Sequence, residues 1–313
     1  MSQIVTDADV ARVIAAAPGL DGAQALPGPA ALASPSCRGL ESAAVFLDLP
    51  DGESRFLKII HPEIRDFLDL PTGFAAAKTA GEAGVAPRVL WSDPEAGAIL
   101  FAAVGPGWRE ARLSDCLDAD FRKNTMQALR RLHEAPANVA RFEPFARLEA
   151  LIAEAGRSGV SLPADLGWIM SLLNAARPVL EAAPLALCRN ESTVSNLMIG
   201  PDQAALLVDF DRAGLNDPMY DLGAVLAEMH EFERDMQATF RGYGGDEAGF
   251  ARARLWSVVD DMIQAIFCRI FGQVSVRKSL EWLKFGEWRL MRARLVLHHP
   301  GFEEKIRIAE GRA

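Results

Sequence analysis

The sequence predicts an α+β fold with two lobes, a smaller β-rich N-terminal lobe and a larger, mainly helical C-terminal lobe. Short apolar runs between residues 44 and 104 alternate with turn-forming sequences, which is typical of antiparallel strands. A Gly-Pro-Gly break follows at 105–107, and apolar residues then recur mostly at helical spacing. We therefore place the lobes at residues 1–104 and 105–313 and expect a ligand cleft between them.

The elements of the N-terminal lobe follow from local patterns. In chain order we expect a helix over 4–17, a loosely ordered Ala-, Gly- and Pro-rich connection over 17–36, strands over 44–49 and 55–60 around the turn sequence PDGE, a helix over 74–83, and two strands around DPEAG between 84 and 104. Lys58 lies among the apolar residues of the second strand. That pattern alone favours a solvent-facing lysine on an edge strand.

The C-terminal lobe is predicted to be helical apart from one interruption. Helices are expected over 121–134, 144–156, 164–182, 251–271 and 276–296. The interruption is the segment from Leu185 to Asp211, whose apolar runs around GPDQ are typical of a hairpin.

Composition bounds the class of protein. Half of the 313 residues are hydrophobic and 24% are charged, as in soluble globular proteins. The net charge of −9 argues against a nucleic-acid or anionic-membrane partner, and no apolar run reaches the ~18 residues of a membrane span. We expect no secretory signal, because the first residues carry neither a basic region nor an apolar run, and the four cysteines form no CxxC pair. We expect a cytoplasmic protein with reduced thiols; a homodimer stays open.

Three polar residues of the segment 187–223 are expected to converge. Glu191 lies in a loop that leaves one apolar strand, Asn196 begins the next strand and Asp209 ends the one after. Hard oxygen ligands of this kind suit Mg²⁺, and a remaining carboxylate can orient a substrate hydroxyl and accept its proton. By themselves, the three residues are equally consistent with an acidic turn that binds no metal.

Two further aspartates are expected to support this segment. Asp217 precedes Pro218, as an N-cap precedes a proline at the first helical position. Asp221 lies in the opening turn, where its carboxylate would brace the neighbouring loop.

The sequence LVDFDRAGLNDPMYDLG, residues 207–223, resembles the metal-binding region of the choline/ethanolamine kinase and aminoglycoside phosphotransferase superfamily, and most of all its bacterial choline-kinase-like branch. The upstream loop of that branch typically reads CHND, four residues, then Asn; here Cys188-Arg189-Asn190-Glu191 precedes Asn196 at the same spacing. Residues 84–101 and 129–136 also resemble the branch. The resemblance implies a protein-kinase-like fold and a phosphotransferase that uses ATP and Mg²⁺.

The resemblance implies a role for each matching position. Lys58 would contact the ATP phosphates, Gly39 would belong to a reduced glycine-rich loop, and Asn196 and Asp209 would hold Mg²⁺. Phe101, Ala102 and Val104 would form the hinge that pairs with adenine.

Two residues depart from the family pattern at the catalytic loop. Glu191 stands where the family has its catalytic Asp, and Arg189 stands where it has His. We expect Glu191 to be a functional carboxylate held by a charge-assisted bond from Arg189. The position that should pair with Lys58 falls near Gly73, so that Glu63, Asp66 or Asp69 would have to substitute.

The acceptor implied by the resemblance is a small amino alcohol such as choline or ethanolamine. Trp256, Asp260 and Trp282 are the residues expected to bind its ammonium group, although aromatic residues of helices also simply pack in cores. Two alternatives stay open: a pseudokinase that binds a nucleotide or an amine without transfer, and a kinase for another alcohol such as a sugar, an aminoglycoside or a thiamine-like compound.

Overall fold

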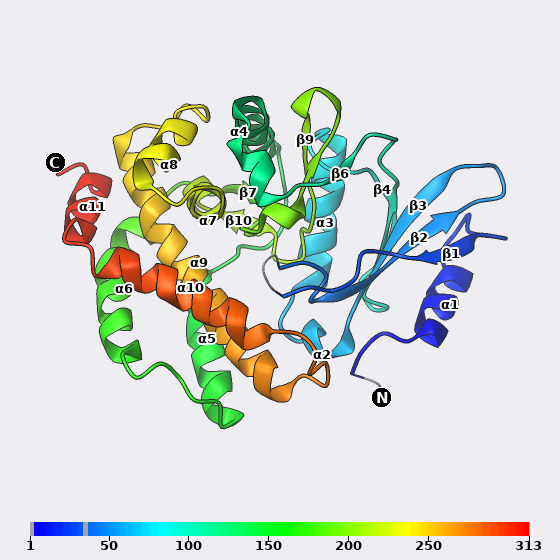
Figure 1. The fold of residues 1–313 in the computed structure, drawn as a ribbon, viewed down its shortest axis with the longest axis horizontal. Coiled ribbons are helices and arrows are strands. Elements are labelled where there is room, and N and C mark those ends of the chain that lie inside the picture. Colours follow the sequence, from blue (N-terminus) through cyan, green and yellow to red (C-terminus); the bar gives the residue numbers. More distant parts are fainter. Residues whose placement is uncertain (1–2, 34–36, 313) are drawn as a thin grey trace.

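A computed structural model describes residues 3–33 and 37–312 (Figure 1). The strands are β1 (Gln24–Pro27), β2 (Ser42–Asp48), β3 (Ser54–Ile60), β4 (Val89–Asp93), β5 (Ala98–Ala102), β6 (Arg109–Glu110), β7 (Ala186–Cys188), β8 (Leu197–Ile199), β9 (Ala205–Leu207) and β10 (Gly214–Asn216). The helices are α1 (Asp7–Ala16), α2 (Pro62–Arg65), α3 (Leu70–Glu82), α4 (Ala119–Glu134), α5 (Pro144–Arg157), α6 (Leu166–Glu181), α7 (Pro218–Met229), α8 (Glu233–Phe240), α9 (Glu247–Val274), α10 (Trp282–Leu297) and α11 (Phe302–Ala309). Single 3₁₀ turns lie at Leu113–Leu117, Val194–Asn196 and Pro201–Gln203.

The N-terminal part is a five-stranded antiparallel sheet with the strand order β1-β2-β3-β5-β4. Lys58 lies opposite Ala44 on β2 and Ile99 on β5, so it occupies the central strand. The interpretation of Lys58 as a residue of an edge strand is therefore wrong. Its neighbours Leu57 and Ile59 face the other way and pack with α1, which leaves Lys58 pointing away from that small core.

Residues 24–27 correct the prediction of a loosely ordered connection over 17–36, of which residues 34–36 lie outside the described part. They form β1, which pairs with β2 from Gln24 opposite Asp48 to Pro27 opposite Val45. Pro27 is tolerated because β1 is an edge strand. Glycine is required at position 28, directly after β1, because a Cβ there would lie 2.4 Å from the carbonyl oxygen of Ala44.

The C-terminal part is built around α9, a 28-residue helix buried along most of its length. Helices α5, α7, α10 and α11 pack on it, and Figure 1 shows the resulting helical mass on the side of the molecule opposite the sheet. Helix α7 crosses α9 at Gly223, where an added Cβ would lie 1.8 Å from the carbonyl oxygen of Ala253. Helix α10 begins at Trp282, later than the predicted start at 276.

Short strands between these two parts carry the polar segment. β8 and β9 form the hairpin predicted around GPDQ, with Leu197 opposite Leu207, and β6 adds to β8. β7 pairs with β10. The α+β fold class is confirmed: an antiparallel N-terminal sheet is followed by a mainly helical region. Among the described residues, no helix combines the length and the apolar character that crossing a membrane would need.

Candidate active site

Lys58 is buried and bridges two carboxylates from the segment after β9. Its Nζ lies 2.7 Å from Asp209 Oδ1 and 2.7 Å from Asp211 Oδ2. Burial lowers the pKa of Lys58, but Asp209 and Asp211 outweigh it and hold the pKa above its usual value. Burial and the adjacent Asp209 raise the pKa of Asp211 to about 7. Lys58 therefore stays charged where it meets the end of the hairpin.

Asp211 pairs with Lys58, in place of Glu63, Asp66 or Asp69, among which the sequence did not choose. Glu63 accepts from Ser275 and Arg277, and Asp69 caps α3 by accepting from the backbone N–H of Thr72. Gly73 lets α3 lie directly against the segment: a Cβ there would be 2.8 Å from the carbonyl oxygen of Phe210. The close approach of α3 to this segment leaves no room for a side chain at position 73.

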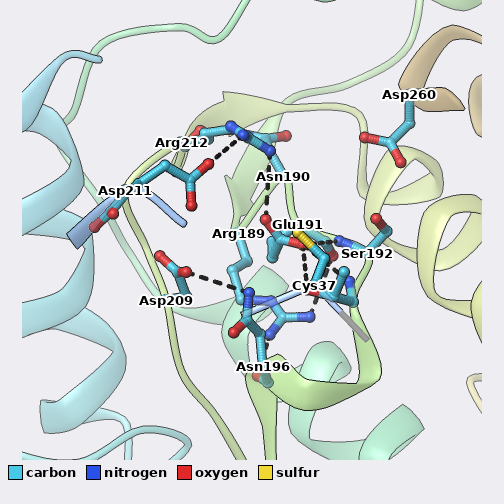
Figure 2. A network of polar contacts seen from close by, with 12 residues as sticks. Cys37, Arg189, Asn190, Glu191, Ser192, Asn196, Asp209, Asp211, Arg212 and Asp260 are labelled. Atoms are coloured by element: carbon cyan, nitrogen blue, oxygen red, sulfur yellow. Dashed lines mark hydrogen bonds and ion pairs between the residues drawn. The ribbon is translucent and has the colours of Figure 1, made fainter. Parts of the chain in front are cut away.

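Asn196 and Asp209 lie side by side, as their positions on the hairpin predict. Asn196 Nδ2 donates to Asp209 Oδ2 over 3.2 Å. Asp209 has a positive φ of 67°, a conformation in which a non-glycine residue is uncommon. Carboxylate oxygens of Glu41, Asp209 and Asp211 all lie within 4.8 Å of one another. The site thus gathers hard oxygen donors next to Lys58. Figure 2 shows two of them, Asp209 and Asp211, on the same side of Glu191.

A cavity of about 390 Å³ opens in front of these residues. Gly39, Phe101, Ala102 and Val104 line it, together with Lys58, Asn196, Asp209 and Asp211. The aromatic rings of Phe56 and Phe101 lie 6.5 Å apart on its sheet side. The cavity is therefore apolar at the sheet and polar at the hairpin, and it holds every residue proposed above for nucleotide and metal binding.

Glu191 is buried and its carboxylate turns back onto its own loop. Oε1 accepts from the backbone N–H groups of Ser192 and Thr193 and from the Thr193 hydroxyl, at 2.8–2.9 Å. Oε2 lies 3.5 Å from Nη1 of Arg212, whose Nη2 contacts Glu41. Oε1 is thus hydrogen-bonded within the loop, and Oε2 shares the guanidinium of Arg212 with Glu41.

Arg189 does not hold the Glu191 carboxylate, which corrects that expectation. Its fully buried guanidinium donates to three carbonyl oxygens, those of Asn196 at 2.5 Å, Val208 at 3.0 Å and Glu191 at 3.1 Å. Burial lowers the pKa of Arg189. Its side chain ties the catalytic loop to β8 and to the end of β9, so it organises the backbone and does not face a substrate.

Asp221, in the first turn of α7, braces the loop, whereas Asp217 caps that helix and contacts α9. Asp221 accepts from the backbone N–H groups of Arg189 at 2.8 Å and Asn190 at 2.7 Å, and it lies 3.1 Å from His133 Nε2. Asp217 caps α7 through the N–H of Met219 and accepts from the indole N–H of Trp256 at 2.9 Å.

The pocket expected from Trp256, Asp260 and Trp282 is not formed. Trp256 is 1% exposed and packs against Phe145 and Tyr220, whereas Trp282 is 2% exposed and packs against Phe267 and Phe271. Trp256 and Phe267 are 11 positions apart on α9, roughly 16 Å along the axis, so the two indoles cannot share one cage. These aromatic residues are core.

Asp260 is also unavailable to a cationic ligand. It accepts from the Tyr220 hydroxyl at 3.0 Å and contacts Arg289 Nη2. Figure 2 shows it on the opposite side of Glu191 from Asp209 and Asp211. The carboxylate is buried and already neutralised by the protein.

Four aromatic rings of the late helices carry guanidinium groups of the chain itself. Arg212 lies over Phe267, Arg277 over Trp282, Arg289 over Phe285 and Arg292 over Trp288, at 4.6–5.7 Å from the ring centroids. The cation–aromatic contacts that an ammonium ligand would make are therefore made internally.

Sequence reasoning missed Asp211, Arg212 and Glu41. The repeated acid in DFD, directly after the predicted strand, was the signal for Asp211. Glu41 and Arg212 are 171 positions apart, and no local pattern marks their contact.

The comparisons with known proteins agree on the fold. A choline/ethanolamine kinase family protein from Mesorhizobium loti matches 97% of this chain and 99% of its own, with 22% identity and a TM-score of 0.78. A Plasmodium vivax ethanolamine kinase matches 92% and 85%, with 11% identity and a TM-score of 0.70. The choline kinase LicA from Streptococcus pneumoniae, also solved in complex with AMP, matches 80% and 88%, with 14% identity and a TM-score of 0.67.

Sequence comparison with curated proteins gives no match. The solved structures confirm the kinase-like fold. The model of the phosphotransferase enzyme family (APH) matches residues 36–256, which is most of the chain. This chain therefore belongs to the phosphotransferase enzyme family.

Proposed function

We propose that the protein transfers the terminal phosphoryl group of ATP, with Mg²⁺, to a hydroxyl group of a small molecule. The observation that carries the proposal is the convergence of Lys58, Asn196 and Asp209 on one cavity that has an apolar side and a polar side. Phosphoryl transfer needs chiefly positioning and charge stabilisation, which such a site supplies.

The nucleotide would lie along the cavity with its base at the sheet. Phe56 and Phe101 offer apolar faces, and the Val104 N–H, which bonds to no residue in the described part of the chain, offers a donor beside β5. Lys58 would bind phosphate oxygens at the other end. Family membership supports nucleotide use, and LicA was solved with AMP.

Mg²⁺ fits the donors at the polar end. Asp209 supplies a carboxylate, Asn196 a carboxamide oxygen, and Asp211 a second carboxylate, and Mg²⁺ prefers oxygen ligands of this type together with phosphates and water. When bound, the ion would neutralise phosphate charge. Lys58 already holds two of these carboxylates in place, so the residues are positioned before a ligand arrives.

Glu191 would orient the acceptor hydroxyl and take its proton. Only Oε2 is suited to this, because Oε1 is occupied by the Ser192–Thr193 turn. Oε2 contacts Arg212 Nη1, and it can exchange this contact for a hydrogen bond from the substrate hydroxyl. Arg212 would then lose its contact with Glu191 and keep its contact with Glu41.

The names of the similar structures make amino alcohols the first acceptors to assay. The residues that were expected to bind an ammonium group are buried and paired, so they do not support that choice here. A nucleotide-binding protein without transfer activity is the second candidate, favoured by the way the Glu191 carboxylate folds back onto its loop.

Transfer from radiolabelled ATP to a panel of small alcohols tests the proposal. The wild-type protein should label at least one acceptor, and Glu191→Gln should lower the rate by about tenfold or more. Glu191→Asp is the matched variant: it keeps the charge but is about one C–C bond shorter, ~1.5 Å, and loses the bonds within the turn. If wild type and Glu191→Gln transfer at the same background rate while both bind ATP, the non-catalytic alternative holds.

A further inference from the structure

A second cavity of about 320 Å³ lies beside the nucleotide cavity. It is lined by the segment from α2 to α3, by residues 141–143 and Arg147 at the start of α5, and by Asp211, Arg212 and Ala213. Asp211 lines both cavities. A molecule in the second cavity therefore lies next to the place proposed for the ATP phosphates.

The inner wall of this cavity carries an unpaired guanidinium. Arg147 is partly buried, with its guanidinium 5.6 Å from the ring centroid of Phe67. Within the described residues it forms no ion pair and no side-chain hydrogen bond. Burial, and secondarily Arg212, lower the pKa of Arg147 to about 10, so it stays charged at neutral pH. A desolvated cation without a partner favours binding of an anion.

The carboxylates around the cavity do not neutralise Arg147. Asp66, Asp69 and Glu143 are exposed at the rim, where water screens them, and Asp69 also caps α3. Asp211 is held by Lys58. The other inner cation, Arg212, is already paired with Glu41 and Glu191.

The late helices, as far as the structure describes them, offer an ammonium ligand no corresponding place. Arginines of the chain cover four aromatic rings of these helices, and the buried acids there are neutralised internally. Arg289 pairs with Asp260 and Asp261, and Arg292 pairs with Asp261 and Glu228. A further cation there would displace an internal one and leave it buried and unpaired, which is strongly unfavourable.

We propose that the second cavity is the acceptor site and that the acceptor is a small hydroxycarboxylate. Its carboxylate would bind Arg147, and its hydroxyl would point past Arg212 toward Glu191. Arg147 is the partly buried guanidinium without a partner, and it matches one carboxylate charge. At the exposed rim Arg141 is outnumbered by three carboxylates, so a phosphate monoester with about −1.5 to −2 would leave excess negative charge there. Planar guanidinium and carboxylate groups also match in geometry.

This inference rests on the proposed function. In the transfer step the acceptor oxygen forms a bond to the γ-phosphorus, and the bond from that phosphorus to the β–γ bridging oxygen breaks. The electron pair leaves with ADP, and the hydroxyl proton goes to Glu191 Oε2. The products are ADP and a phosphorylated hydroxycarboxylate, so no other reactant is needed.

The test is calorimetric binding of matched probes to the protein saturated with AMP-PNP and Mg²⁺. The probes are glycolate and glycerate, their neutral counterparts ethylene glycol and glycerol, and the cationic counterpart ethanolamine. Glycerate is expected to bind about tenfold or more tightly than glycerol or ethanolamine. Arg147→Gln should remove that preference, Arg147→Lys should retain part of it, and the exposed control Arg131→Gln should leave it unchanged.

Nucleotide binding separates failure of this inference from failure of the proposed function. AMP-PNP affinity should be the same in wild type, Arg147→Gln and Arg131→Gln. If AMP-PNP binds but ethanolamine binds better than glycerate, if no probe binds, or if Arg147→Gln leaves glycerate affinity unchanged, the acceptor assignment is overturned. If AMP-PNP itself does not bind, the proposed function fails, and the same titration without nucleotide still decides whether Arg147 binds carboxylates.

Discussion

Replacing Arg189 with Met tests whether this buried guanidinium organises the catalytic loop. The guanidinium donates to three backbone carbonyl oxygens and, among the residues that the structure describes, to no carboxylate. Met fills a similar volume but donates nothing. The oxygens of Glu191, Asn196 and Val208 would then remain buried without this donor.

The expected change in the free energy of unfolding is the sum of two opposing contributions. The Asn196 carbonyl keeps the bond from the Val208 N–H, so losing the guanidinium costs about 1 kcal/mol there and about 1–3 kcal/mol at each of the other two carbonyls, roughly 3–7 kcal/mol in all. Removing a fully buried guanidinium recovers part of its desolvation penalty, several kcal/mol. We therefore expect the free energy of unfolding of Arg189→Met to fall by ~2–4 kcal/mol.

The assay is urea unfolding combined with calorimetric titration of AMP-PNP and Mg²⁺. Loss of the bonds to Asn196 and Val208 should also weaken Mg²⁺-dependent nucleotide binding, because these residues adjoin Asp209. Exposed Arg131→Met is the matched control. An Arg189→Met protein that unfolds at the wild-type urea concentration and binds nucleotide normally would refute the reasoning.

Three further predictions concern the core and the pH dependence. Trp256→Phe removes the indole donor to Asp217 and should lower the unfolding free energy by ~1–3 kcal/mol, with no change in the Michaelis constant for any acceptor; a selective rise in that constant would return Trp256 to the acceptor site. Gly223→Ala, whose Cβ would lie 1.8 Å from the carbonyl oxygen of Ala253, should force α7 and α9 apart and lower the melting temperature markedly; calorimetric scanning that shows a wild-type melting temperature would contradict this close contact. Burial lowers the pKa of His61 from 6.5 to about 4, so the unfolded chain binds more protons within that interval and stability should fall as pH drops through it; urea titrations should show a smaller fall for His61→Gln.

The segment that carries Asn196 and Asp209 was predictable because its geometry is local. Asn196 and Asp209 lie on the β8–β9 hairpin, with Leu197 paired to Leu207, so alternating apolar residues and a turn sequence suffice to bring them together. The same holds for Asp217 and Asp221, whose roles follow from their places at the start of α7.

The contacts that were missed join distant parts of the chain. Lys58 and Asp209 are separated by 151 positions, and the central place of β3 in its sheet depends on pairing with β5. Residues 44–60 alone do not show that β5 pairs with β3, so the sequence pattern favoured an edge strand. Arg212 could be assigned to Glu41 only once the fold had brought them together.

The acceptor pocket was mistaken because aromatic and acidic residues on a helix serve two purposes equally well. Trp256, Asp260 and Trp282 have the chemistry of an ammonium cage, but they also suit a core whose acids are neutralised from a neighbouring helix. The decisive partner, Arg289, lies on α10, and its pairing with Asp260 depends on how α10 packs against α9. The residue types alone cannot show whether a buried acid is neutralised by another residue of the chain or by a bound ligand.

The metal–nucleotide site is tested most directly by one calorimetric experiment, titration of AMP-PNP into wild type and Asp209→Ala with and without Mg²⁺. Wild type should bind AMP-PNP more tightly in the presence of Mg²⁺, and Asp209→Ala should lose that gain, while the exposed control Glu303→Ala should behave as wild type. An Asp209→Ala protein that retains the full Mg²⁺-dependent gain would contradict the placement of metal and nucleotide between Lys58, Asn196 and Asp209.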